Sequence, residues 1–130
     1  MEYKSKNHTV YRCTYHVVFC PKYRRRILKD GIDTELKTLM HEFSQKKNFE
    51  ILEMEVMPDH VHLLVDLFPD YAPLEMVRQM KHYTAKMLKR KFPEINSKLP
   101  NLWTRSAFVS TTGGAPLEII KEYIENQKGK

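Results

Sequence analysis

Cysteine is nearly absent from this chain of 130 residues, which contains only Cys13 and Cys20. Two cysteines cannot form the disulfide framework of a small secreted domain, and these two lack the close spacing of zinc ligands. Their interval of seven residues places them on opposite faces of one strand, so we expect no bond between them. No segment approaches the roughly 20 apolar residues of a membrane span, and the N-terminus has no signal-peptide pattern. We therefore expect a cytoplasmic protein that does not associate with membranes.

Acidic residues are fewer than basic ones: the chain has 16 aspartates and glutamates against 22 lysines and arginines, which gives a formal net charge of +6. Such an excess favours a polyanionic partner such as a nucleic acid, although many basic proteins bind nothing specific. The hydrophobic content of 42% and the charged content of 29% are typical of a globular protein. We expect residues 1–130 to form a single domain with a substantial core.

Hydrophobic periodicity predicts the order strand, helix, strand, strand, helix, strand, helix. The expected elements are a strand at 9–20, a helix from Asp33 or Thr34 to about Lys47, strands at 51–57 and 60–67, a helix from Pro73, a loop at 93–100, a strand at 106–112 and a helix over about 116–128. The first six elements match a ferredoxin-like (RRM-like) split βαβ arrangement of the α+β class. We expect one antiparallel sheet with two helices on one face, an open second face and an additional C-terminal helix.

Two histidines stand at the start of an aliphatic strand. His60 and His62 share one strand face, while the alternate positions are uniformly apolar and point to the core. If Pro58 and Asp59 form a two-residue turn, Glu55 pairs with His62 and becomes a candidate carboxylate behind that ring. Two imidazoles roughly 7 Å apart can converge on one divalent ion. Two ligands are too few, however, and an isolated pair of this kind is more often simply exposed.

Basic residues gather in two places that could contact phosphates. One is the cluster Arg24, Arg25 and Arg26, where Tyr23 is available to stack on a base. The other is one side of the second helix, which carries Arg78, Lys81, His82 and Lys86. Each could equally be a solvated surface, but the two share one sign of charge, which favours nucleic-acid binding.

The last helix has a polar edge beside its apolar side. Ile119, Tyr123 and Gln127 fall at i, i+4 and i+8, so the phenol and the amide project together. Ordinary packing of Tyr123 at a helix edge explains the same pattern. The spacing alone therefore leaves the role of both residues open.

The strand His60-Val61-His62 and the terminal Tyr123-Ile124-Glu125-Asn126-Gln127 together resemble the small single-tyrosine HUH transposases. The similarity extends to Met57-Pro58-Asp59, to the segment 102–112 and to the glycine pair Gly113-Gly114. Members of this family mobilise the simplest bacterial and archaeal insertion sequences as single-stranded DNA. The resemblance covers nearly the whole chain.

The resemblance implies that His60, His62 and the side-chain oxygen of Gln127 hold a divalent cation, Mg²⁺ or Mn²⁺. An amide oxygen with open water positions suits such an ion, although imidazoles would equally accept Zn²⁺ or Ni²⁺. It further implies that Tyr123 attacks a DNA phosphate and forms a 5′-phosphotyrosine. The family recognises hairpin ends and forms homodimers that share the active site, and the glycine pair is a plausible hinge for exchange of the last helix. Whether Tyr123 acts in cis or in trans, and which group takes its proton, is not specified by the sequence.

Two other functions fit parts of the same pattern. A non-catalytic ferredoxin-like module that binds single-stranded RNA or DNA would present stacking aromatics on the open face. A metal-dependent phosphodiesterase using water as its nucleophile would leave Tyr123 in a structural role. The family resemblance makes the transposase, a metal-dependent single-strand endonuclease and strand transferase, our leading hypothesis.

Overall fold

The computed structural model describes residues 3–6, 9–111 and 117–130. In chain order its elements are β1 (Lys4–Lys6), β2 (Thr9–Tyr11), β3 (Thr14–Phe19), the short 3₁₀ turn η1 (Lys22–Arg24), α1 (Ile32–Lys46), β4 (Glu50–Met57), β5 (His60–Asp66), α2 (Pro73–Lys91), α3 (Glu94–Lys98), β6 (Phe108–Thr111) and α4 (Leu117–Asn126). No helix in these ranges is both long and apolar enough to cross a membrane.

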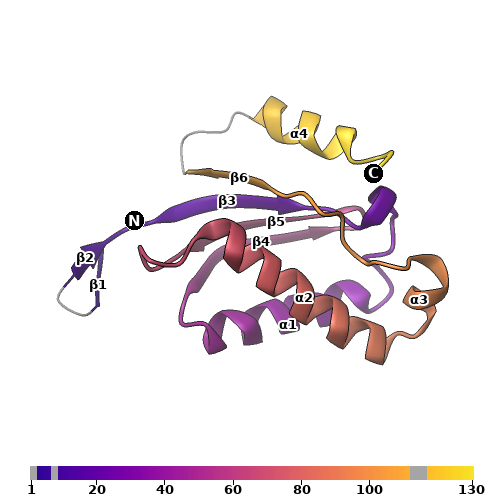
Figure 1. The fold of residues 1–130 in the computed structure, drawn as a ribbon, viewed down its shortest axis with the longest axis horizontal. Coiled ribbons are helices and arrows are strands. Elements are labelled where there is room, and N and C mark those ends of the chain that lie inside the picture. The colour runs from indigo at the N-terminus through magenta and orange to yellow at the C-terminus, as the bar shows by residue number, and fades with distance from the viewer. Residues whose placement is uncertain (1–2, 7–8, 112–116) are drawn as a thin grey trace.

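Four strands form the main sheet in the order β4-β5-β3-β6, and every neighbouring pair is antiparallel. The central strands are the first and third of the four, which is the arrangement of a split βαβ fold. Helices α1 and α2 pack side by side against one face, and α4 lies on the other face (Figure 1). The expected α+β, ferredoxin-like class with its extra C-terminal helix is therefore confirmed.

Strand alternation explains where the core lies. Val17 and Phe19 of β3 and Val61 and Leu63 of β5 are fully buried and face α1 and α2. The helices contribute the matching apolar stripes, with Leu36, Met40, Met76, Met80 and Leu88 among the buried side chains. The residues between the buried strand positions, including His16, His60 and His62, consequently point to the α4 side of the sheet.

The predicted continuous strand at 9–20 is wrong in one respect. The chain leaves the extended ladder at Arg12 and Cys13, because β2 pairs with β1 in a separate two-stranded hairpin while β3 alone enters the main sheet. The backbone N–H of Cys13 instead donates to the buried carboxylate of Asp66. Both cysteines are free, as expected.

The start of the first helix and the predicted loop at 93–100 also differ from the prediction. The first helix begins at Ile32 rather than at Asp33 or Thr34, because Asp30 and Gly31 both adopt positive φ and turn the chain into the helix there. The predicted loop at 93–100 contains the short helix α3, whose Ile95 is buried. The predicted hinge at Gly113-Gly114 and the predicted helix start at Pro116 lie outside the described residues.

Candidate active site

The β4–β5 hairpin has the predicted register. Met57 pairs with His60, Val56 with Val61 and Glu55 with His62, around a turn at Pro58 and Asp59. Glu55 therefore lies opposite His62 on the same face of the sheet, where its negative charge favours protonation of the imidazole. The carboxylate that bonds directly to a site histidine is a different one, that of Asp59.

Asp59 orients the first histidine. Its Oδ1 lies 2.8 Å from Nδ1 of His60, which leaves Nε2 of that ring as the nitrogen available to a ligand. A carboxylate behind an imidazole is the usual support of a metal-binding histidine. In the sequence, Asp59 is predicted only as a turn residue, although a carboxylate directly before a candidate ligand is a signal for this role.

His16 of β3 meets the second histidine. Its Nδ1 lies 3.2 Å from Nε2 of His62, and the two ring centroids are 5.3 Å apart. Burial lowers the pKa of His62, and the neighbouring His16 lowers it further, so the imidazole is neutral near pH 7. Only the pairing of β3 with β5 brings His16 here, because Val18 pairs with His62 and His16 stands two residues along the same face.

These histidines fit half of a divalent-metal site. Both rings lie on one face, the bond of His60 to Asp59 uses Nδ1 and not Nε2, and His62 is held neutral as a metal ligand must be. Within the described ranges no three His, Cys, Asp or Glu side chains gather closely enough to hold an ion by themselves. Gln127 is the further ligand expected from the sequence.

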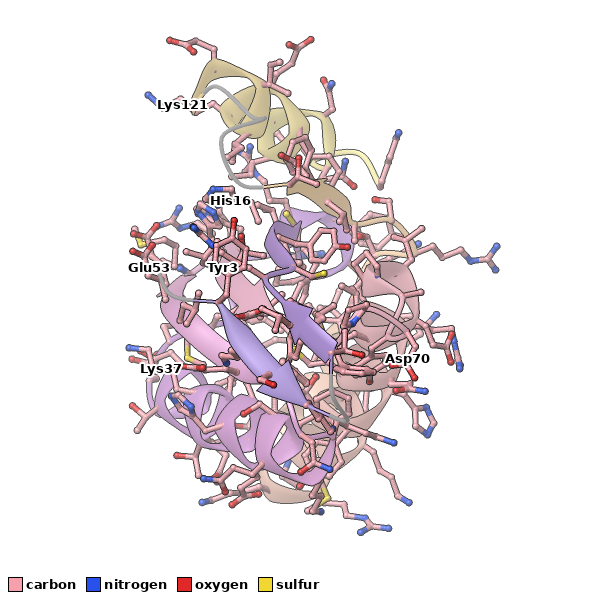
Figure 2. The ribbon with its side chains drawn as sticks, turned by 90° about the vertical axis from the view of Figure 1, so that its left-hand side faces the viewer. Tyr3, His16, Lys37, Glu53, Asp70 and Lys121 are labelled. Carbon is pink, nitrogen blue, oxygen red and sulfur yellow. The ribbon has the colours of Figure 1, made fainter. Side chains whose placement is uncertain are left out.

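Helix α4 covers the same sheet face as the histidines. Phe108 pairs with Val18, and Val18 pairs with His62, so these three side chains form one row across β6, β3 and β5. The ring of Tyr123 packs on Phe108 with centroids 5.7 Å apart. Figure 2 shows His16 on the α4 side of the sheet and Lys37 of α1 on the opposite side. Phe108, on which the phenol ring packs, is about two strand spacings, roughly 10 Å, from His62 in this row.

Ser106 binds both functional groups of α4. Its hydroxyl donates to Oε1 of Gln127 at 2.9 Å and lies 2.9 Å from the hydroxyl of Tyr123. A serine has one hydroxyl proton, so Tyr123 is the donor in the second bond and is a neutral phenol here. Burial raises the pKa of Tyr123, an effect that the bond to Ser106 opposes. Gln127 is 3% exposed, and its Nε2 donates to the backbone oxygen of Tyr123.

Tyr123 and Gln127 therefore come together as the stripe on α4 predicts, and His60 and His62 come together as the hairpin predicts. The amide oxygen of Gln127 is engaged by Ser106, so it must exchange that partner before it can serve as a ligand. Ser106 was missed at the sequence level because nothing in its neighbourhood distinguishes it from an ordinary strand-entry serine.

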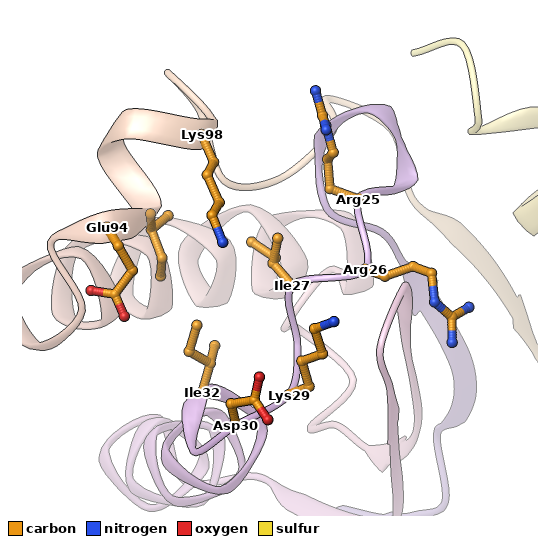
Figure 3. Close-up of a pocket in the computed structure, with 9 residues that line it drawn as sticks. Arg25, Arg26, Ile27, Lys29, Asp30, Ile32, Glu94 and Lys98 are labelled. Carbon is orange, nitrogen blue, oxygen red and sulfur yellow. The ribbon is translucent and has the colours of Figure 1, made fainter.

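The three consecutive arginines have different environments. Tyr23 and Arg24 adopt left-handed backbone conformations with φ of 60° and 52°, which direct the Arg24 side chain inward to 17% exposure. There its guanidinium contacts Asp59 and Glu125. Arg25 and Arg26 are exposed. They border a pocket of about 390 Å³ between the β3–α1 connection and α3, and Figure 3 shows them extending away from it while Lys98 reaches toward Ile27.

The cations of α2 lie on the opposite layer of the molecule from the histidines. His82 and Lys86 are exposed, and Arg78 forms an ion pair with Glu75 of the same helix. His82 lines a groove of about 450 Å³ together with Lys22, Lys89 and Arg105. This groove is strongly basic and open to a polyanion.

Lys81 differs from its neighbours on α2. Its ammonium donates to the backbone oxygens of Thr104 at 2.9 Å and of Ser106 at 2.6 Å, and burial lowers its pKa to about 8. It supports the segment that carries Ser106, so its ammonium is engaged by the protein.

We expect Lys81→Met to lower the free energy of unfolding by about 1–3 kcal/mol, because two carbonyl oxygens lose their donor. The exposed Lys86→Met should leave stability within about 0.5 kcal/mol of the parent. Urea denaturation followed by circular dichroism measures both changes. Equal stability of the two variants would show that the Lys81 contacts contribute nothing to the fold.

Comparison with solved structures identifies this architecture as a transposase domain. The chain superimposes on the crystal structure of a Deinococcus radiodurans transposase with a TM-score of 0.89 and 32% identity, covering 98% of this chain and 99% of that one. A REP-associated tyrosine transposase bound to a REP hairpin shares the fold with a TM-score of 0.58 at 16% identity, over 94% of this chain and 68% of that one.

The particular family is that of the IS200-like transposases, to which this chain belongs: the family model matches residues 9–127. The ISDra2 transposase TnpA of Deinococcus radiodurans is 33% identical over all of this chain and 94% of its own length. The transposase of insertion element IS200 from Salmonella typhimurium is 32% identical over 95% of this chain and 82% of its own. The chain is thus an insertion-sequence transposase, an enzyme that cuts and joins DNA.

Proposed function

We propose that the chain acts as one HUH domain that cleaves and rejoins single-stranded DNA at hairpin-bearing ends of its insertion sequence, with Tyr123 as the nucleophile. The observation that carries this proposal is the placement of the Tyr123 helix on the sheet face that bears His60 and His62. Gln127, the residue that directly follows α4, accompanies the phenol.

In the proposed reaction the Tyr123 oxygen attacks the scissile phosphorus. The new bond joins that oxygen to phosphorus, and the bond from phosphorus to the 3′ oxygen breaks. The phenol proton is lost to solvent and the departing 3′ oxygen gains one, so the products are a 5′-phosphotyrosine and a free 3′-OH. The covalent link retains the phosphodiester, and a second 3′-OH can therefore reverse the step at a new site without ATP.

His60, His62 and the oxygen of Gln127 would hold Mg²⁺ or Mn²⁺. When bound, this ion supplies Lewis-acid polarisation of the scissile phosphate. The residues of the chain prepare that site: Asp59 fixes His60, burial keeps His62 neutral, and Ser106 holds Gln127 beside the phenol. Glu55, opposite His62, adds a negative charge behind the ligands.

We assign DNA-backbone binding to exposed cations. These are Arg25, Arg26, His82 and Lys86, with Lys22 and Arg105 in the same basic groove as His82. Three candidates from the sequence, Arg24, Arg78 and Lys81, already have protein partners.

We further propose that the protein forms a homodimer in which the active site is shared between subunits. We also propose that it acts in the cytoplasm, where the DNA is.

The test is covalent trapping. Wild-type protein incubated with single-stranded oligonucleotides covering both ends of its insertion sequence, plus Mg²⁺ or Mn²⁺, should give a protein–DNA adduct on denaturing gels, and EDTA should prevent it. Reversible binding without any adduct would instead favour a non-catalytic nucleic-acid module.

A further inference from the structure

Arg24 stands apart within the arginine cluster because its side chain points into the protein. Arg25 and Arg26 are exposed, whereas the Arg24 side chain is only 17% exposed. The inward direction follows from two successive left-handed residues, Tyr23 and Arg24, each in a conformation that residues other than glycine rarely adopt. Such backbone geometry persists only where surrounding contacts hold it.

The contacts of Arg24 join the two halves of the active site. Its Nε lies 3.4 Å from Oδ2 of Asp59, and the other carboxylate oxygen of Asp59 lies 2.8 Å from the ring of His60. Its Nη1 donates to the Glu125 carboxylate at 2.9 Å and to the backbone oxygen of Ile124 at 3.4 Å. A continuous path therefore runs from His60 through Asp59 and Arg24 to the two residues that directly follow Tyr123.

The chemistry of the contact requires an arginine. A planar guanidinium presents donors in a fixed fork and can bond Asp59 and Glu125 at the same time, whereas a lysine offers one point charge. The backbone oxygen of Ile124 belongs to the last turn of α4, where a cation is favoured by the helix dipole. These contacts occupy Nε and Nη1 of Arg24 with protein partners.

We propose that Arg24 is a positioning residue that fixes the Tyr123 turn of α4 relative to His60, and not a DNA contact. This inference rests on the proposed function, since it assigns Arg24 a purpose only if Tyr123 and His60 act on the same phosphate. In a dimer that shares the active site, Arg24 would hold whichever subunit's α4 lies on its own sheet face, because exchange of an identical helix keeps the same contacts. A displacement of the nucleophile by about 1 Å can cost on the order of 100-fold in rate. The effect of losing Arg24 should consequently appear in the chemical step and not in affinity.

The experiment compares Arg24→Ala and Arg24→Lys with Arg25→Ala and with Lys37→Ala. Arg25→Ala removes a proposed phosphate contact, and Lys37→Ala removes one positive charge from α1, on the far layer. For each protein we would measure the dissociation constant for the single-stranded oligonucleotide as a function of salt, and the rate of adduct formation at saturating DNA.

For Arg24→Ala we expect the adduct rate to fall at least about 10-fold, with an affinity within about threefold of wild type and an unchanged salt slope. Arg24→Lys should be intermediate. Arg25→Ala should weaken binding and reduce the salt slope by about 0.7, the value for one phosphate contact on a single strand. Lys37→Ala should resemble wild type. If Arg24→Ala instead lowers affinity and salt slope and keeps the full rate at saturation, it is a DNA contact and the proposal is overturned.

Hydrogen exchange of the DNA-free proteins supplies a readout that does not depend on catalysis. Arg24→Ala and the surface change Glu125→Gln should both speed exchange of α4 amides relative to β3 and β5, because each removes the same ion pair. Unchanged hydrogen exchange in both variants would overturn the proposal that Arg24 holds α4, even if catalysis is affected. If wild type forms no adduct, the proposed function fails, and the exchange experiment still decides whether Arg24 holds α4.

Discussion

Tyr123→Phe should abolish the covalent protein–DNA adduct while leaving oligonucleotide affinity within about threefold of wild type. The substitution removes only the hydroxyl, and with it the nucleophile, so we expect cleavage to fall by at least about a thousandfold. The ring remains packed on Phe108, and loss of the bond to Ser106 should cost about 0.5–1.5 kcal/mol of stability. Denaturing gels at saturating DNA measure the adduct, and anisotropy measures the affinity.

Tyr3→Phe is the matched control, since Tyr3 is 73% exposed and makes no part of the proposed site. It should form the adduct at the wild-type rate. Strand cleavage that survives Tyr123→Phe would identify water as the nucleophile and make the enzyme a metal-dependent phosphodiesterase with a structural Tyr123.

His62→Ala should have the second-largest effect. Removing one of two imidazole ligands should weaken Mn²⁺ binding at least about 10-fold and lower metal-dependent cleavage by about 100-fold or more. Titration calorimetry with Mn²⁺ alone gives the affinity, and single-turnover cleavage gives the rate. His41→Ala, an exposed histidine on α1, is the control and should change neither. Wild-type Mn²⁺ affinity in His62→Ala would remove His62 from the metal site.

The shifted pKa of His62 predicts how the stability of the fold changes with pH. In the folded chain the pKa of His62 lies below its ordinary value of 6.5, chiefly because the ring is buried. Between those two pKa values the unfolded chain binds more protons, so His62 favours the folded state above about pH 6.5 and this contribution is lost as the pH falls through the window. Metal binding should weaken in the same direction, because a ligand imidazole must be neutral.

Local chemistry explains why much of the fold could be predicted from the chain. Alternation around His60 and His62 defines which strand face is polar, and the Pro58-Asp59 turn then determines the Glu55–His62 register, which the structure confirms. The stripe that joins Tyr123 and Gln127 likewise depends only on helix periodicity. In these cases the partners lie within a few residues or a few turns of each other.

The contacts that could not be predicted from the sequence all join segments that are distant in the chain. His16 reaches His62 only because β3 inserts beside β5, and Ser106 meets Tyr123 only because α4 folds back over β6. Arg24 was grouped with Arg25 and Arg26 by composition, yet two left-handed backbone conformations direct it to Asp59 and Glu125. Lys81 was grouped with a basic helix side, yet its ammonium donates hydrogen bonds to two backbone oxygens of the segment before β6.

By itself, the sequence determined the order of elements, the polar face of the histidine strand, the pairing of a phenol with an amide on the last helix, and the excess of positive charge. Each of these follows from periodicity, turn geometry or composition, which act over short range. Only the tertiary structure decided that the phenol helix covers the histidine face and which cations are buried as supports. Those outcomes depend on strand order and side-chain burial, which bring residues about 100 positions apart into contact.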